Sequence, residues 1–206
     1  MLTFYFGQGT CALATLIALE EAGLAYEPRK LSLKDSEQRS PEYLKINPKG
    51  RVPALVTDRG VLTEGVAILA YIAQIAPQAK LAPVDDPFEF ARMQAFNSYI
   101  ASTVHVNHAH SRRGSRWADD PAAIAAMAAK VPQTMAESFQ MIEDKMLEGP
   151  WVMGGQYSVA DPYLFTMARW LPGDGVDMAR FPKVSAHHAR MLERPAVRAA
   201  LAADQA

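Results

Sequence analysis

Cys11, the only cysteine of this chain, is the residue with the most distinctive chemistry. It follows the short apolar stretch Leu2–Phe6 and a turn containing Gly7 and Gly9, at the point where an apolar helical pattern begins. A thiol at a helix start lies near the positive end of the helix dipole and near unpaired N–H groups, and both stabilise a thiolate. We therefore expect the pKa of Cys11 to lie below the usual value of about 8.5. The alternative is a small buried apolar residue, as most free cysteines are.

Three histidines and a basic cluster lie further along the chain. His105, His108 and His110 fall in one helical pattern, but only the first two share a helix face, and no carboxylate lies among them. We therefore predict no metal site. A histidine can hold or pass a proton beside a thiol, or it can be a solvated or core residue. A basic and aromatic cluster that follows could line a substrate pocket or form a solvated helix end. The members of that cluster are Arg112, Arg113, Arg116 and Trp117.

The N-terminal part of the chain alternates strand and helix patterns. In order, these predict a strand at Leu2–Phe6, a helix at Cys11–Ala22, a strand at Tyr26–Leu33, a helical turn at Pro41–Ile46, a hairpin of Ala54–Thr57 and Val61–Thr63, and a helix from Glu64. This order admits a mixed four-stranded sheet with helices on both faces. Pro28 favours an edge position for the second strand.

After a connector rich in alanine, proline and aspartate, the sequence shows only helical patterns. The predicted helices are Phe88–His110, Pro121–Leu147, Pro162–Trp170, Pro182–Leu192 and Ala196–Ala203. Ser158 and Asp161 stand at capping-box spacing, so we expect them to fix a helix start. We predict an α/β domain at residues 1–76, a linker at 77–87 and an all-helical domain at 88–206.

The composition excludes several classes of function. A net charge of −1 provides no global field for nucleic acid or an anionic membrane. A single cysteine rules out an internal disulfide framework and indicates a reducing compartment. The apolar runs are too short to span a bilayer. We therefore expect a soluble, cytoplasmic protein that binds neither nucleic acid nor membranes.

Four stretches, by their sequence, order and spacing, resemble those of a known family over most of the chain. They are Tyr5 to Cys11, Asn47–Pro53, Leu62–Ile68, and Ser158–Phe165 with Arg169 and Trp170. Together they resemble the cytosolic glutathione transferases, and among these most of all the bacterial beta class. The resemblance implies a thioredoxin-like N-terminal domain with the order βαβ-α-ββα, an all-α C-terminal domain and a homodimer. It also implies a role in detoxification with glutathione as co-substrate and no further cofactor.

The resemblance further implies where glutathione binds. The Val52–Pro53 bond would be cis, and Val52 would pair with the cysteinyl part of glutathione. The γ-glutamyl carboxylate would dock at Gly65, at a helix start, while Glu64 would hold the ammonium group. Arg51 could meet the glycine carboxylate, with Lys49 and Lys34 as other candidates. The simpler alternatives are a trans proline, a helix cap and solvated cations.

Catalytic roles follow from the same resemblance. His105 would face the thiol of Cys11 and act with it. A tyrosine near the position of Tyr5 activates the sulfur in other classes, although a core aromatic is the favoured interpretation while Cys11 is present. The turn before Cys11 is one residue longer than in the usual beta-class form, which leaves the direction of the thiol open. The second-substrate pocket would include His108, Arg112, Arg113 and Trp117.

The expected function is attack of the glutathione thiolate on a small apolar electrophile. Two alternatives stay open. One is a glutathione-dependent thiol-disulfide reductase acting through Cys11, with a second glutathione resolving the mixed disulfide because the chain has no second cysteine. The other is a protein that binds glutathione and apolar ligands without turnover.

Overall fold

A four-stranded mixed sheet underlies the N-terminal half of the computed structural model, which describes residues 1–205. The strand order is β2-β1-β3-β4; β1 pairs in parallel with β2 and antiparallel with β3, and β4 pairs antiparallel with β3. The predicted element order and the edge position of the strand containing Pro28 are confirmed. The elements are β1 (Leu2–Phe6), α1 (Ala12–Ala22), β2 (Tyr26–Lys30), η1 (Glu37–Arg39), α2 (Pro41–Ile46), β3 (Ala54–Thr57), β4 (Gly60–Thr63) and α3 (Gly65–Ile75).

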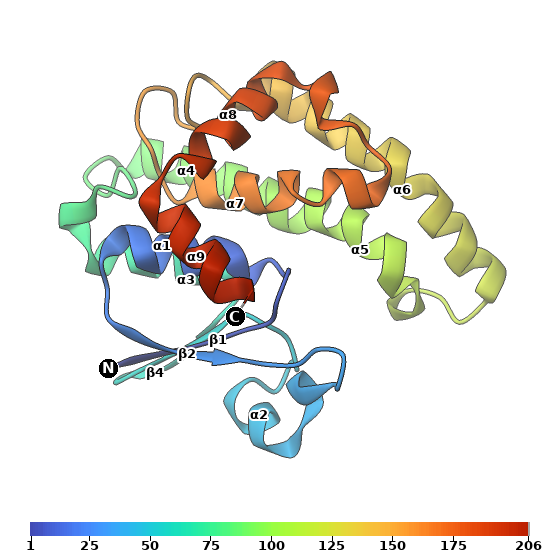
Figure 1. Ribbon diagram of the computed structural model, residues 1–206, viewed down its shortest axis with the longest axis horizontal. Helices are drawn as coiled ribbons and strands as arrows, with labels where there is room; N and C mark the ends of the chain where they lie inside the picture. Colours follow the sequence, from blue (N-terminus) through green and yellow to red (C-terminus); the bar gives the residue numbers. More distant parts are fainter. Residues whose placement is uncertain (206) are drawn as a thin grey trace.

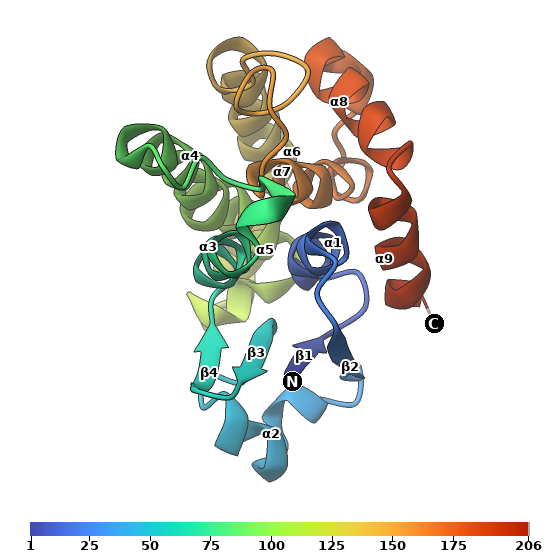
Figure 2. The ribbon, with the colours of Figure 1, turned by 90° about the vertical axis from the view of Figure 1, so that its left-hand side faces the viewer.

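Helices cover both faces of this sheet, as Figures 1 and 2 show: α1 and α3 lie on one face and α2 on the other. Successive side chains of β1 point to opposite faces of the sheet, and those on the α1–α3 face are the buried ones. Phe4 and Phe6 are buried in a core that includes the apolar residues of α1 and α3. β2 ends at Lys30, earlier than the predicted Leu33, because its partner β1 ends at Phe6, whose carbonyl accepts a last bond from the Leu31 N–H at 2.8 Å.

The C-terminal half is helical. Residues of the predicted helix Phe88–His110 form two α-helices joined by a π-helical turn, a local widening that apolar periodicity does not reveal. The elements are η2 (Pro77–Ala79), α4 (Pro87–Tyr99), η3 (Ile100–Val104), α5 (His105–Arg113), η4 (Gly114–Arg116), α6 (Pro121–Met141), η5 (Ile142–Met146), α7 (Ala160–Ala168), η6 (Leu171–Asp174), η7 (Met178–Arg180), α8 (Pro182–Leu192) and α9 (Pro195–Gln205).

One buried carboxylate organises the start of α7, whose residues are all buried. Asp161 accepts from the N–H groups of Val152 and Ser158, both at 2.7 Å, and lies 3.0 Å from Nε2 of His187. The predicted role of Ser158 and Asp161 at this helix start is confirmed, because the Ser158 hydroxyl oxygen also accepts from the Ala160 N–H at 3.2 Å; α7 begins at Ala160 rather than at the predicted Pro162. No helix within residues 1–205 has the length and apolar character needed to cross a membrane.

The last helix returns to the first half of the molecule. α9 packs beside α1 (Figure 2), and Arg194 at its start pairs with Glu21 of α1, with a shortest N–O separation of 2.5 Å. The N-terminal fold is therefore completed by residues from the far end of the chain. The division at residues 77–87, between α3 and α4, stays a prediction.

Candidate active site

The turn between β1 and α1 brings Cys11 to the start of a buried helix. Thr10 fixes this start, because its hydroxyl donates to the Gly7 carbonyl at 2.7 Å and its oxygen accepts from the Ala12 N–H at 3.3 Å. Thr10 thus supplies a side-chain cap, whereas Cys11 makes no capping bond. The thiol is free to face a cavity.

The same turn is held from the C-terminal half. The Gly9 N–H donates to the Asp204 carboxylate at 3.1 and 3.3 Å, and the Gly9 carbonyl accepts from the Trp170 indole N–H at 3.2 Å. Gly9 has a φ of +67°, which suits glycine. Sequence reasoning missed Asp204, because a contact across 195 positions leaves no local pattern. The long turn before Cys11 is therefore fixed by two distant side chains.

The Cys11 thiol points to the loop before β3. Sγ donates to the Val52 carbonyl oxygen, at 3.8 Å. The surrounding walls exclude much of the water that a thiolate needs, and this burial raises the Cys11 pKa to about 11, although Arg113 and Arg51 oppose the rise. The predicted lowering of this pKa is wrong, since desolvation outweighs the favourable helix start.

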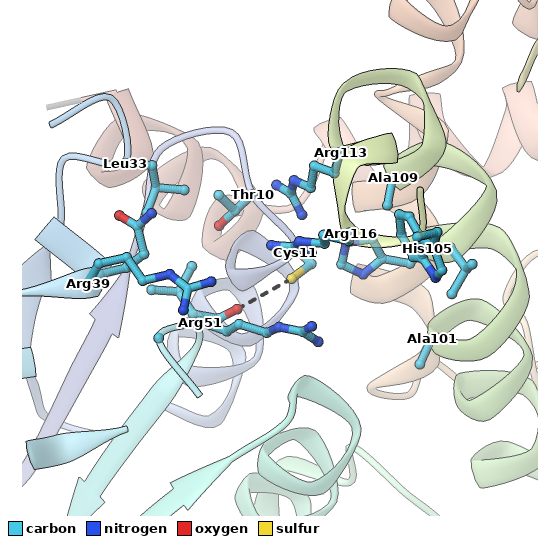
Figure 3. A pocket seen from close by; sticks show the side chains of 15 residues that line it. Thr10, Cys11, Leu33, Arg39, Arg51, Ala101, His105, Ala109, Arg113 and Arg116 are labelled. Atoms are coloured by element: carbon cyan, nitrogen blue, oxygen red, sulfur yellow. Dashed lines mark hydrogen bonds between the residues drawn. The ribbon is translucent and has the colours of Figure 1, made fainter. Parts of the chain in front are cut away.

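The loop before β3 is fixed by two side chains beneath it. The Tyr43 hydroxyl and the Asn47 side-chain amide both donate to the Arg51 carbonyl, each at 2.7 Å. The Val52–Pro53 peptide bond is cis, as the resemblance implies. The Arg51 side chain lies beside Cys11 in the same cavity (Figure 3).

Backbone strain marks the start of α3. Glu64 has a φ of +70°, a conformation that residues other than glycine rarely adopt. Gly65 and Val66 follow in the first turn, where N–H groups lack helical partners, and all three residues line a cavity. Lys49 pairs with the Glu64 carboxylate and also donates to the Thr63 hydroxyl at 2.7 Å. The place suits a ligand group that carries both a carboxylate and an ammonium.

Two cavities meet at Cys11. One, of about 330 Å³, extends toward α5 and η4, and the other, of about 150 Å³, extends toward the start of α3. Both are lined by Cys11, Arg51, Val52, Ala101 and His105. We define the sheet-side wall as Cys11, Arg51, Val52, Glu64 and Gly65. We define the helix-side wall as His105, Arg113, Arg116 and Trp117, of which Figure 3 labels the first three.

His105 enters the helix-side wall directly after the π-helical turn η3, a feature frequently found at functional sites. Burial, with the positive charge of Arg113 next in importance, lowers the His105 pKa to about 4. At neutral pH His105 is therefore an uncharged imidazole, which can accept a hydrogen bond. It does not form the imidazolium that would stabilise a Cys11 thiolate.

Family models match both halves of the chain. Residues 2–74 match the glutathione S-transferase N-terminal domain, and residues 93–195 match the glutathione S-transferase C-terminal domain. The chain belongs to the glutathione S-transferase family. It is therefore an enzyme of a family that uses glutathione as co-substrate and needs no prosthetic group, so the predicted fold, enzyme class and co-substrate are confirmed.

Individual transferases support this membership. A glutathione transferase homolog from Sulfitobacter, solved with bound glutathione, is 48% identical, has a TM-score of 0.94, and is matched over 97% of this chain and 96% of its own. Glutathione S-transferase GstA of Escherichia coli O157:H7 is 31% identical over 203 residues, 97% of each chain. A beta-class glutathione S-transferase of Sphingomonas chungbukensis is 33% identical, with a TM-score of 0.84 and 98% of each chain covered.

The transferase separates its predicted second-substrate residues between two cavities. Arg113 and Trp117 line the larger cavity at Cys11, whereas His108 and Arg112 line a neighbouring one of about 310 Å³. His108 Nδ1 lies 2.8 Å from the buried Asp174 carboxylate, and its ring stacks on Trp170 at 4.0 Å between centroids. His108 and Arg112 therefore do not line the pocket that holds the thiol.

The side chains of the three clustered histidines of the transferase do not converge on one point. The rings of His105 and His108 both lie against Trp170, whereas His110 lies against Trp117. Within residues 1–205, no group of three or more His, Cys, Asp or Glu side chains is placed to hold a metal ion.

Tyr5 lies elsewhere in the transferase. Successive side chains of a strand point to opposite faces, and Tyr5 alternates with the buried Phe4 and Phe6. Its ring lies 5.5 Å from that of Tyr43, centroid to centroid, and it lines neither cavity at Cys11. We leave Tyr5 out of the chemistry proposed below, because this position does not fit its predicted catalytic role.

Proposed function

We propose that this glutathione transferase is of the bacterial beta type and conjugates glutathione to an electrophile held in the 330 Å³ cavity beside Cys11. One observation carries the proposal: Cys11, the cis Val52–Pro53 bond and the start of α3 surround adjoining cavities. The 33% identity to the beta-class enzyme of Sphingomonas chungbukensis supports the class.

In this proposal glutathione lies along the sheet-side wall. Its γ-glutamyl carboxylate accepts from the N–H groups at the start of α3, and Glu64 exchanges Lys49 for the ammonium group. The cysteinyl backbone pairs with Val52, and the glycyl carboxylate meets Arg51. The sulfur then lies near Cys11, between the two walls.

Cys11 acts in this proposal as a neutral hydrogen-bond donor. With its pKa raised to about 11 it is protonated at neutral pH, and an S–H group can donate weakly to a glutathione thiolate. Neutral His105 accepts a hydrogen bond from the glutathione thiol, and the thiol proton leaves to solvent when the thiolate forms. Arg51, which lines both cavities at Cys11, adds positive charge near the sulfur.

The reaction is a displacement at carbon. The sulfur lone pair forms the carbon–sulfur bond, and the bond to the leaving group breaks with its electron pair staying on that group. A reductase reaction would instead need Cys11 as a thiolate that attacks a disulfide sulfur. The raised pKa of Cys11 therefore favours transfer over reduction.

The test compares wild type with Cys11→Ser and Cys11→Ala, using chlorodinitrobenzene and glutathione. Loss of one weak hydrogen bond in Cys11→Ala should cost about fivefold in kcat/KM, whereas the hydroxyl of Cys11→Ser should preserve most of it. Iodoacetamide should alkylate Cys11 slowly at neutral pH and faster as the pH approaches about 11.

Two results would contradict this scheme. Absence of transfer by the wild-type protein would remove the proposed function, leaving glutathione binding without turnover. Loss of all transfer in both variants, with a glutathione adduct on wild-type Cys11 in intact mass spectra, would point to the disulfide chemistry instead.

The homodimer is part of the proposal and is supported by an exposed apolar surface. Val61 of β4, Ile75 of α3 and Phe88 of α4 are exposed, Phe88 by 72%. Figure 2 shows β4, α3 and α4 on the same side of the molecule. Light scattering after gel filtration should give twice the mass of the chain, and Phe88→Asp should shift it toward the monomer. A monomeric wild type would overturn this part.

A further inference from the structure

The larger cavity at Cys11 carries an excess of positive charge. Among residues 1–205 its lining includes four arginines and neither aspartate nor glutamate. No ion pair joins any of these four to a carboxylate within the same range. Burial, and then the charges of the other three, lower the pKa of Arg116, as expected for cations held together without a counter-ion. The four are Arg39, Arg51, Arg113 and Arg116.

Glutathione accounts for only part of this charge. On the proposed function, its γ-glutamyl carboxylate binds at the start of α3, in the smaller cavity. Its glycyl carboxylate and its thiolate are then the two anions left to meet the four arginines. Arg39 and Arg51 come from the sheet side, next to the glycyl end, whereas Arg113 and Arg116 come from α5 and η4 on the opposite wall (Figure 3). Two cations remain in excess.

Resting on the proposed function, we infer that the second substrate is an anionic electrophile, whose carboxylate binds Arg113 and Arg116 while its reactive carbon faces the glutathione sulfur. The planar guanidinium matches a carboxylate in two parallel hydrogen bonds. Trp117, Val106 and Ala109 supply apolar surface in the same cavity for the body of the molecule. The carboxylate is unchanged in the reaction, since only the bond to the leaving group breaks. This substrate class differs from the small apolar electrophile expected from the resemblance.

The experiment uses two electrophiles with the same leaving group, a chloronitrobenzoate and its methyl ester. Each rate with saturating glutathione is divided by the uncatalysed rate, which removes the difference in intrinsic reactivity. The wild-type enhancement should be about tenfold greater for the acid, because hydrogen bonds to a charged group are lost with the ester. Added salt should reduce this preference, because part of the pocket is exposed.

The Arg113→Ala/Arg116→Ala variant should lower kcat/KM for the acid by about 10- to 100-fold more than for the ester. The loss should fall mainly in KM for the acid, because the carboxylate is bound equally before and during the reaction. The Arg113→Lys/Arg116→Lys variant keeps both positive charges but lacks the planar guanidinium groups. It should therefore show part of the preference for the acid that the double alanine variant loses. Arg59→Ala, in the β3–β4 turn and away from the cavity, is the matched control and should leave both rates unchanged.

Equal enhancement of acid and ester by the wild type would overturn the inference. So would a double variant that raises KM for glutathione and affects both electrophiles alike, because the arginines would then belong to the glutathione site. If the protein transfers nothing, including to chlorodinitrobenzene, the proposed function fails. In that case, calorimetric titration with glutathione present decides the inference separately: tighter binding of the acid than the ester supports it, and the reverse contradicts it.

Discussion

The two walls of the cavity at Cys11 are built in different ways. The sheet-side wall presents backbone groups, at Val52 beside a cis proline and at the start of α3. The helix-side wall presents the ends of long side chains from α5 and η4. A wall of backbone groups suits a co-substrate that is the same in every reaction, because substitutions alter backbone groups little. Side chains at helix ends, in contrast, can be substituted without altering the fold, so this wall can be adapted to different second substrates. The division of the cavity thus matches a fixed glutathione site facing a variable second site.

α7 packs against α1, which begins beside Cys11, and against η3, which leads into His105. Removing the carboxylate that fixes the start of α7 should therefore have the largest effect. Asp161→Ala leaves the buried N–H groups of Val152 and Ser158, and the ring of His187, without their acceptor. We expect a loss of about 3–5 kcal/mol in the free energy of unfolding, measured by urea titration. Asp177→Ala, at an exposed helical cap, is the matched control and should cost about 1 kcal/mol. Equal effects of the two substitutions would contradict the central role of Asp161.

On the helix-side wall, the protonation of His105 should make the stability of the protein depend on pH. Its pKa is lowered to about 4 in the folded state, from about 6.5 when unfolded. Between these values the unfolded chain binds more protons, so stability falls as the pH decreases from about 6.5 toward about 4. The loss attributable to His105 should approach 3 kcal/mol. His105→Gln should flatten the pH dependence of urea stability in this window, and identical slopes for variant and wild type would contradict the prediction.

The turn at Asn47 to Pro53 and the helix start at Glu64-Gly65 could be predicted from the sequence because their determinants are local. The cis Val52–Pro53 bond was implied only by the family resemblance, since trans is the usual form before proline. The direction of the Cys11 thiol and its raised pKa could not be predicted, since both depend on burial by residues far away. The hydrogen bond from the Gly9 N–H to the Asp204 carboxylate could not be predicted for the same reason. Arg39 belongs to none of the motifs, and only the fold brings it into the cavity.

A change confined to the sheet-side wall should affect glutathione alone. Glu64→Gln removes the charge proposed to hold the ammonium group, so KM for glutathione should rise about fivefold while kcat changes little. The effect is modest because the Glu64 side chain is 64% exposed. Steady-state kinetics with glutathione varied measure this effect, and Glu42→Gln, at an exposed position of α2, is the control. A large fall in kcat would mean that the walls are not separate in function.

The smallest expected effect tests the connection between the walls. Asp204→Ala removes the acceptor of the Gly9 N–H, and Trp170→Phe removes the donor to the Gly9 carbonyl while keeping an aromatic ring beside His108. Each should lower kcat/KM about two- to threefold by loosening the turn that aims Cys11. Because both act on one turn, the double variant should lose less than the product of the single effects. Fully multiplicative losses would show that the two contacts act independently, and that α9 and Trp170 do not hold the turn as one unit.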